Sequence, residues 1–287
     1  MRATTESQGD VGSAAMTDFE PILDLETVNL ERSGGVARIE LSRPEKLNAW
    51  NARLTEDLLA SLEAIAADGA LRSVLLTGAG RSFCSGADLT EVGDAFVTDD
   101  GKPDLQRSLR ERYHPVILGF RELPRPVVAA VRGGAVGVGL SLALSADLVY
   151  ASADAYFLLA FVNIGLVPDG GSSAFVPARI GQARATEMAM LGERVGAEKA
   201  EEWGLINGVF ADDRLSGETE AIARRLAEGP TRSYAGSKRQ TNRWLFGAVG
   251  EQLEFEAAVQ QEMAGSEDFV EGVSAFTQKR PASFTGR

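Results

Sequence analysis

The sequence is poor in the residues that build disulfides and transition-metal sites. Its 287 residues include one cysteine, Cys84, and one histidine, His114. A single cysteine excludes an internal disulfide and is typical of a reducing compartment, so we expect a cytoplasmic location. No group of His, Cys and Asp residues has metal-ligand spacing, so we expect no metal site.

Positive charge and long apolar runs are also scarce. Lys and Arg number 29 against 41 Asp and Glu, which gives a formal net charge of −12. Proteins that bind nucleic acid need a basic surface, so we expect no nucleic-acid partner. An anionic ligand must therefore be bound locally, by a few cations or by a helix N-terminus. No apolar run reaches the length that spans a bilayer, so we expect no membrane partner.

The pattern of elements divides the chain into three parts. Residues 1–18 are small and polar without the apolar core of a signal peptide, and we expect a disordered leader there. In residues 19–211, strand patterns alternate with helix patterns, which predicts an α/β fold with a largely parallel sheet. Residues 212–287 are predicted to be helical. Such a tail often packs on a neighbouring subunit, which favours an oligomer, and packing on its own core is the alternative.

Individual elements follow from local signals. A Gly-Gly turn between two alternating stretches predicts a β-hairpin, and Asn51 is placed to cap a helix with a leucine-rich face. A further helix runs from Leu105 to just before Pro124. Buried or short strands are expected at 73–77, 127–131, 147–151 and near Tyr156, and C-terminal helices at 213–228, 230–245, 249–264 and 266–279.

A glycine-rich stretch at residues 131–147 lies at the centre of these predictions. An apolar strand pattern leads into four glycines, and a helix pattern of small apolar residues follows them. A strand that turns through glycines into a helix leaves unpaired N–H groups at the helix start. Because glycine also lets a ligand approach closely, this stretch is a candidate site for negative charge. Tight packing of helix on sheet explains the same residues equally well.

Six segments, taken in order, resemble the enoyl-CoA hydratase/isomerase, or crotonase, superfamily. They are residues 43–49, 83–89, 126–139, 146–150, 164–171 and 276–281. The resemblance runs from about Thr27 to the C-terminus. It implies a spiral of ββα units with a C-terminal helical oligomerisation region that forms a homotrimer or hexamer. It also implies an acyl-CoA thioester as substrate, with coenzyme A as part of that substrate and no separate cofactor.

The resemblance further implies chemistry through a thioester enolate. Two backbone N–H groups would receive the charge that develops on the carbonyl oxygen, and they match Ala87 and Val138. The family usually has glycine at the second position. Valine keeps the N–H group but narrows the approach to it.

Departures from the hydratase pattern point to a different reaction. The two hydratase glutamates are matched by Ser141 and Phe161, so hydration by two carboxylates is not expected. Asp169 instead matches the base of Δ3,Δ2-enoyl-CoA isomerases and ring-epoxide isomerases, and the nucleophile of 4-chlorobenzoyl-CoA dehalogenase. Our hypothesis is that Asp169 is a single catalytic base. Because the segment around it also has the composition of a helix start, an N-cap role for Asp169 is the alternative.

The resemblance also implies contacts to the substrate. Arg43 and Lys46 lie on the loop that passes the nucleotide, and Lys279 matches a lysine that reaches a neighbour's CoA phosphate, although each cation could be a solvated surface charge. Asp88 is expected to fix its own loop. The full set of implied substrate contacts is Arg43, Lys46, Leu47, Ala49, Ser85, Gly86, Asp88, Leu89, Phe161, Phe276 and Lys279.

These observations predict an acyl-CoA isomerase. Two alternatives stay open: another enolate chemistry of the superfamily, such as epoxide isomerisation or dehalogenation, and a non-catalytic acyl-CoA-binding paralogue. Dehalogenation is less favoured because no histidine matches the dehalogenase helper. His114 matches no base of the family and Cys84 has no paired base, so a structural role is the favoured interpretation of both.

Overall fold

The computed structural model describes residues 19–90, 96–99 and 101–287, so the expected leader lies outside the described residues. Its larger sheet has seven strands. In spatial order they are β1 (Glu20–Leu23), β2 (Val28–Ser33), β3 (Val36–Leu41), β4 (Ser73–Gly78), β5 (Val127–Val131), β7 (Leu148–Ser152) and β10 (Gly208–Phe210). From β3 to β10 all neighbours are parallel, while β1, β2 and β3 pair antiparallel. The predicted hairpin and the largely parallel sheet are confirmed.

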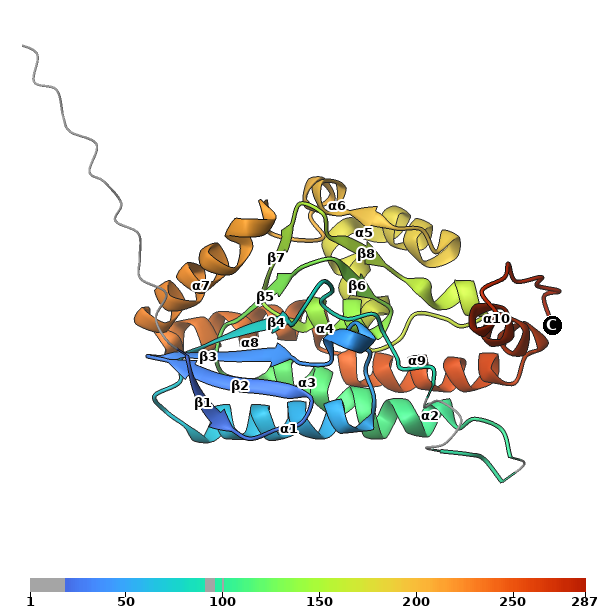
Figure 1. The fold of residues 1–287 in the computed structure, drawn as a ribbon, viewed down its shortest axis with the longest axis horizontal. Helices are drawn as coiled ribbons and strands as arrows, with labels where there is room; N and C mark the ends of the chain where they lie inside the picture. The colour runs from blue at the N-terminus through green and yellow to red at the C-terminus, as the bar shows by residue number, and fades with distance from the viewer. Residues whose placement is uncertain (1–18, 91–95, 100) are drawn as a thin grey trace, which may run out of the picture.

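A smaller sheet and a set of helices complete the fold (Figure 1). The smaller sheet contains β6 (Gly134–Val136), β8 (Tyr156–Leu158) and β9 (Val195–Gly196). The helices of the α/β core are α1 (Ala52–Ala67), α2 (Leu105–Ser108), α3 (His114–Glu122), α4 (Val138–Ser145), α5 (Ser172–Leu191) and α6 (Ala197–Trp203). A π-helical turn (Leu109–Tyr113) joins α2 to α3, and short 3-10 helices cover Pro44–Lys46 and Ala160–Ile164.

Chain segments alternate between the two sheets in a repeating order. Strand β5 of the large sheet is followed at once by β6 of the small sheet and then by α4, and β7, β8 and α5 repeat this order. Gly133 makes the crossing from β5 to β6 possible, because its φ is +58° and a Cβ there would lie 2.1 Å from the Arg81 carbonyl oxygen. The structure therefore confirms the expected spiral of ββα units.

The central strands of the large sheet, β4 and β5, are buried on both faces. Helix α7 (Asp212–Glu228) covers one face over β4 and β5, and the main hydrophobic core with α1, α3 and α4 lies on the other. Strands covered on both sides need apolar residues at every position, which explains the continuous apolar run of β5.

The remaining C-terminal helices are α8 (Thr231–Phe246), α9 (Val249–Ala264) and α10 (Glu267–Thr277). Their bounds agree with the predicted helices to within two residues. Ala257 and Ala264 of α9 and Phe269 of α10 belong to the main core of their own chain. Packing on its own core, the alternative interpretation of the tail, is therefore correct for α9 and α10. Helix α10 lies at the opposite end of the molecule from α7 (Figure 1).

Candidate active site

A cavity of about 630 Å³ lies where the loop after β4, the start of α4, the π-helical turn and α10 meet. Of the residues implied in binding or catalysis, all line its wall except Arg43 and Lys279. Five of the six segments that carry the family resemblance, all except residues 146–150, are thus brought together around one space. The described residues contain no group of three or more His, Cys, Asp or Glu side chains that could hold a metal ion.

Two glycines bring the expected oxyanion donors together. Gly86 and Gly137 have φ values of +93° and +53°, and a Cβ on Gly86 would lie 3.9 Å from the Cα of Gly137. Ala87 and Val138 directly follow them, and Val138 is the first residue of α4. Within the described residues, neither amide donates a hydrogen bond to another protein group. This arrangement offers two free N–H groups, one of them at a helix N-terminus, to a developing negative charge.

Backbone hydrogen bonds to Trp50 hold the loop that carries Ala87 in place. The Trp50 N–H donates to the Gly86 carbonyl oxygen and the Asp88 N–H donates to the Trp50 carbonyl oxygen, at 2.8 and 3.0 Å. The Asp88 carboxylate accepts hydrogen bonds from Thr90 and pairs with the Arg43 guanidinium at 3.0 Å. Asp88 therefore fixes its own loop, as the sequence suggested, and holds the Ala87 amide, one of the two expected oxyanion donors, in place.

Of the three cations predicted to bind the CoA phosphates, only Lys46 lines the cavity. Lys46 lies on the cavity wall, whereas Arg43 lies behind it and donates to the Ala49 carbonyl oxygen as well as pairing with Asp88. Lys279 is exposed just after α10 and is not part of the wall. The wall instead contains three cations that the sequence did not single out: Arg112, Arg194 and Arg280.

Asp169 lies on the cavity wall with only 4% of its surface exposed. Its Oδ2 accepts a hydrogen bond of 2.8 Å from Nε2 of Gln260, a residue of α9. Its Oδ1 is buried and has no hydrogen-bond partner among the described residues. Burial raises the pKa of Asp169 to about 8; the Gln260 hydrogen bond lowers this pKa and the nearby Glu256 charge raises it. The result is a buried carboxyl group with one free oxygen and a pKa in the working range of a general base.

The structure assigns the capping of α5 to another residue. The N-cap of α5 is Gly171, and no side chain of the preceding segment caps the helix. Glu256 of α9 accepts hydrogen bonds from the N–H groups of Gly171 and Ser173, at 2.8 and 3.1 Å. The N-cap alternative for Asp169 is therefore wrong, because a carboxylate from a distant helix takes that position.

Ser141 and Phe161, which match the two hydratase glutamates, make different contacts in this structure. The Ser141 hydroxyl is fully buried and donates to the backbone carbonyl oxygen of Asp169 at 2.7 Å. Phe161 lies on the cavity wall, 3.7 Å from the place of a Cβ on Gly137. One position thus anchors the candidate base, and the other presents an apolar ring to the oxyanion site.

Comparison with known proteins agrees with this geometry. The family model described as enoyl-CoA hydratase/isomerase matches residues 31–287. The chain belongs to this family. A probable enoyl-CoA hydratase of Rhodobacter capsulatus is 43% identical over 261 residues, covering 91% of this chain and 98% of that protein.

Two further relatives extend the comparison. The 1,2-epoxyphenylacetyl-CoA isomerase of Escherichia coli is 40% identical over 254 residues, covering 88% of this chain and 96% of the relative. A solved structure, described as an enoyl-CoA hydratase from Mycobacterium avium subsp. paratuberculosis, superposes with a TM-score of 0.81 at 36% identity. It covers 91% of this chain and 100% of that chain. The protein is thus an acyl-CoA enzyme of the enoyl-CoA hydratase/isomerase family.

In this family member a π-helical turn shapes one side of the cavity. The sequence predicted one continuous helix from Leu105, but residues Leu109–Tyr113 form a π-helix between α2 and α3. Tyr113 lies on the wall, and its ring meets the Trp50 ring edge-on with centroids 5.1 Å apart. Burial, together with the charge of Asp169, raises the pKa of Tyr113, so its hydroxyl stays protonated.

His114 and Cys84 are both buried and neither lines the cavity. Burial lowers the pKa of His114 to about 4, so the imidazole is neutral at physiological pH, with Nδ1 3.7 Å from Glu254. Burial raises the pKa of the Cys84 thiol to about 12, and a Cβ on Gly139 would lie 2.6 Å from the Cys84 carbonyl oxygen. Their positions fit the structural role favoured from the sequence.

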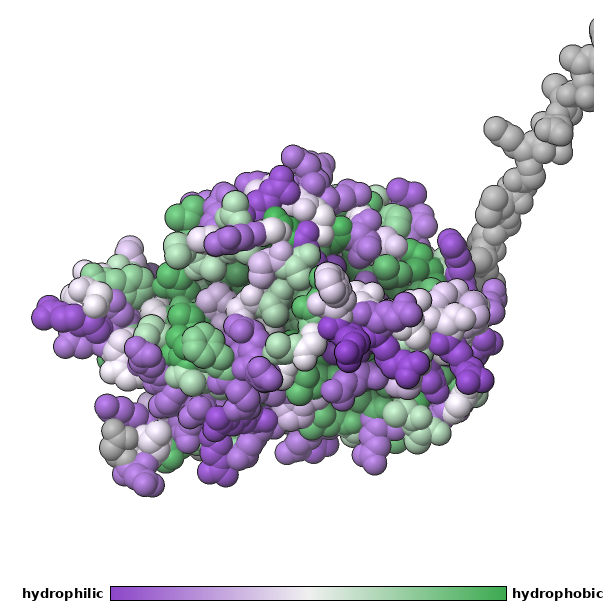
Figure 2. Space-filling view, turned by 180° about the vertical axis from the view of Figure 1, so that it is seen from behind, coloured by the Kyte–Doolittle hydropathy of each residue, from purple (hydrophilic) through white to green (hydrophobic). Residues whose placement is uncertain are grey.

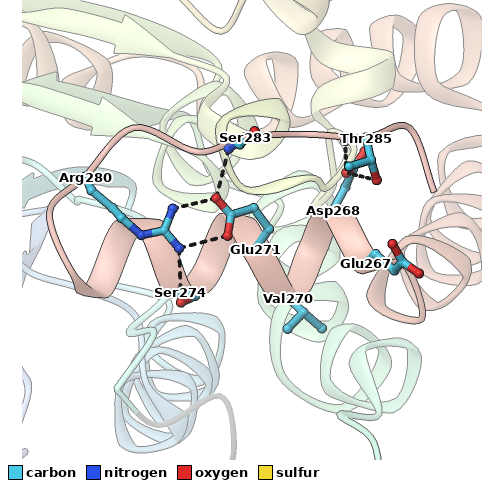
Figure 3. Close-up of a pocket in the computed structure, with 8 residues that line it drawn as sticks. All are labelled: Glu267, Asp268, Val270, Glu271, Ser274, Arg280, Ser283 and Thr285. Carbon is cyan, nitrogen blue, oxygen red and sulfur yellow. Dashed lines mark hydrogen bonds and ion pairs between the residues drawn. The ribbon is translucent and has the colours of Figure 1, made fainter.

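Helix α10 and the residues after it line part of the cavity, and Figure 3 shows a second pocket that the same helix forms with the C-terminal segment. Arg280, which lines the cavity wall, forms a bidentate ion pair with the carboxylate of Glu271, with N–O distances of 2.5 and 2.8 Å. Glu271 also accepts from the Ser283 N–H, and Asp268 accepts from the Thr285 N–H. Two carboxylates on one face of α10 thus fasten the C-terminal segment onto the helix that lines the site.

Proposed function

We propose that the protein is an acyl-CoA isomerase that moves a double bond from C3–C4 to C2–C3 with Asp169 as its proton carrier. Two carboxylates, Asp88 and Asp169, belong to the cavity wall. Asp88 is occupied by Arg43 and Thr90, whereas Oδ1 of Asp169 has no partner within the described residues. Among the described residues of the wall, this oxygen is the one carboxylate oxygen without a partner. It carries the proposal, because an isomerase needs one base and a hydratase of the usual kind needs two.

The reaction then proceeds by a balanced proton shuttle. Ionised Asp169 takes the proton from C2 of a 3-enoyl thioester, and the electron pair of that C–H bond moves onto the thioester carbonyl oxygen. The N–H groups of Ala87 and Val138 stabilise the resulting dienolate oxygen. Protonated Asp169 then returns the proton to C4 as the electrons shift back, so that the enzyme ends in its starting state.

The apolar surroundings of Asp169 support isomerisation over hydration. Phe161, Leu166 and Phe269 contribute to the same wall, and Phe161 stands where a hydratase has a water-activating glutamate. The described wall therefore lacks a second unpaired carboxylate, which the usual hydratase mechanism needs to activate water. We therefore expect the 2-enoyl product to leave the site without being hydrated.

Replacement of Asp169 by Asn tests the proposal. We expect Asp169→Asn to lower kcat for 3-enoyl-CoA by at least about 10³-fold, because amide oxygen cannot accept the α-proton. Turnover is measured by the absorbance of the conjugated 2-enoyl thioester, and calorimetric binding of an acyl-CoA serves as the control for folding. Turnover that survives in a folded, ligand-binding variant would disprove the assignment.

A second candidate reaction, isomerisation of a ring epoxide of an aryl-acetyl-CoA, is favoured by the Escherichia coli relative of that name. It would use the same base and the same oxyanion site. Parallel assays with 3-enoyl-CoA, 2-enoyl-CoA and a ring-epoxide thioester separate the reactions by substrate. Tight binding of every ester without turnover of any would identify a non-catalytic binder.

A further inference from the structure

We infer that Gln260 of α9 is the positioning residue for Asp169, and that it makes Oδ1 the oxygen that carries the proton. The inference rests on the proposed function, since it concerns the orientation of the proposed base. It assigns a part in catalysis to α9 of the C-terminal helical region, for which the sequence implied only oligomerisation and the substrate contacts of Phe276 and Lys279.

The Gln260 amide is held in one orientation. Its side chain is 1% exposed, its Nε2 donates to Oδ2 of Asp169 at 2.8 Å, and its Oε1 accepts from the Val167 N–H at 3.1 Å. A flipped amide would face the Val167 N–H with another N–H, and would face the Asp169 carboxylate with an oxygen. Both contacts would be repulsive, so the backbone of the loop determines which Gln260 atom meets Asp169.

This orientation gives the two carboxylate oxygens of Asp169 different roles. Oδ2 keeps its hydrogen bond from Gln260 whether Asp169 is ionised or protonated, because a carboxylic acid still has a carbonyl oxygen that accepts. The proton taken from the substrate then resides on Oδ1, which has no partner within the described residues. Gln260 therefore needs no rearrangement between proton removal at C2 and proton return at C4.

The same face of α9 holds the other end of the loop. Glu256 lies one helical turn before Gln260 and accepts from Gly171 and Ser173, while Gln260 holds Val167 and Asp169. Residues four apart on a helix project from one face. A single helix face thus fixes residues 167–173 on both sides of the base.

Within the described part of the chain, few titratable groups influence Asp169. Glu256 on α9 and Tyr113 on the π-helical turn are the titratable groups coupled to it, and Ser141 on α4 contacts its backbone as a neutral hydroxyl. Gln260 itself is uncharged. Replacing Gln260 with Leu therefore removes its hydrogen bonds to Asp169 and to the Val167 N–H without changing the charge around the base.

The test is Gln260→Leu measured against the neighbouring change Gln261→Leu. Gln261 lies on the same helix but bonds to Gln106 and Pro103 instead of the base. We expect Gln260→Leu to lower kcat about tenfold with little change in KM, since a hydrogen bond to a charged group is lost. The midpoint of the pH profile should move upwards, because that bond lowers the pKa of Asp169. Gln261→Leu should leave the midpoint in place.

The outcomes distinguish this inference from the proposed function. If Asp169→Asn abolishes turnover while Gln260→Leu keeps the wild-type kcat and midpoint, the positioning role is wrong and the proposed function stands. If Asp169→Asn retains turnover, the proposed function fails. Carbon-13 NMR titration of the Asp169 carboxyl group then decides the Gln260 contact separately, because a titration midpoint that is the same in wild type and Gln260→Leu would overturn it.

Discussion

Burial shifts the pKa of Asp169 upwards, and this upward shift determines how the activity of the enzyme depends on pH. Burial raises that pKa to about 8, far above the value of about 4 for an exposed Asp. The ionised form is the base, so we expect kcat/KM to rise with pH, reach half its maximum near pH 8 and level off above it. Initial rates across pH 5–10 on 3-enoyl-CoA measure this, and a profile already flat at pH 6 would contradict it.

The pH dependence of protein stability tests the upward pKa shift of Asp169 independently of activity. The folded state holds the Asp169 proton more tightly than the unfolded state, so the group's contribution to stability is lost as pH rises from about 4 to about 8. In Asp169→Asn this loss is absent. The difference in thermal unfolding midpoint between variant and wild type should therefore be small near pH 4 and should favour the variant at pH 8.

How well residues could be predicted depends on where their partners lie in the sequence. Asp169 was identified through the family resemblance of residues 164–171, whereas the local composition by itself indicated a helix start. Its partner Gln260 lies 91 residues further on, and Glu256 lies 85 residues from Gly171. Nothing in the pattern of α9 distinguishes these two buried polar residues from the neighbouring exposed ones, and only the packing of α9 beside the loop gives them a role.

At the scale of elements, α9 acts as the support of the active-site loop. Glu256 is 3% exposed and satisfies the backbone N–H groups of Gly171 and Ser173. We expect Glu256→Ala to lower the free energy of unfolding by about 3 kcal/mol, because buried donors lose their charged acceptor. Urea unfolding followed by circular dichroism measures this change.

Glu254 offers the matched comparison for Glu256. It lies two residues earlier on α9, is half exposed, and pairs with Arg110 at 2.6 Å. Exposed ion pairs contribute little, so Glu254→Ala should cost less than about 1 kcal/mol. Equal losses in the two variants would show that Glu256 does not hold the loop as described.

Elements with strong local signals could be predicted, and elements made by tertiary pairing could not. The hairpin, the Asn51-capped helix α1 and the C-terminal helices follow from turn residues, a cap and helical periodicity. Strand β6 has three residues and exists because it pairs with β8. The π-helical turn adds only a small offset to a helical pattern, which residue spacing does not reveal.

At the scale of the whole molecule, the exposed apolar surface supports the oligomer that the family resemblance implies. Green hydrophobic areas interrupt the purple hydrophilic surface in Figure 2. The large apolar side chains that are exposed include Met190, Leu191, Trp244 and Leu245, with Trp244 at 87%. Surfaces of this kind are typical of contacts between protein chains.

We therefore predict a homotrimer in solution, either alone or paired into a hexamer. Light scattering after size exclusion should give a mass about three or six times the 30.5 kDa of one chain. Trp244→Glu should shift the distribution towards smaller species, because a charge would be buried in the contact. A wild-type protein that elutes as a single chain at tens of micromolar would contradict the prediction.

The fastening of the last residues onto α10 has a practical consequence. The Arg287 carbonyl oxygen accepts from the Asp268 N–H, and the Gly286 N–H donates to the Asp268 carboxylate. The helix thus fastened also supplies Phe276 to the cavity wall. A purification tag or fluorescent fusion joined after Arg287 is expected to weaken these hydrogen bonds and so loosen a helix that lines the cavity.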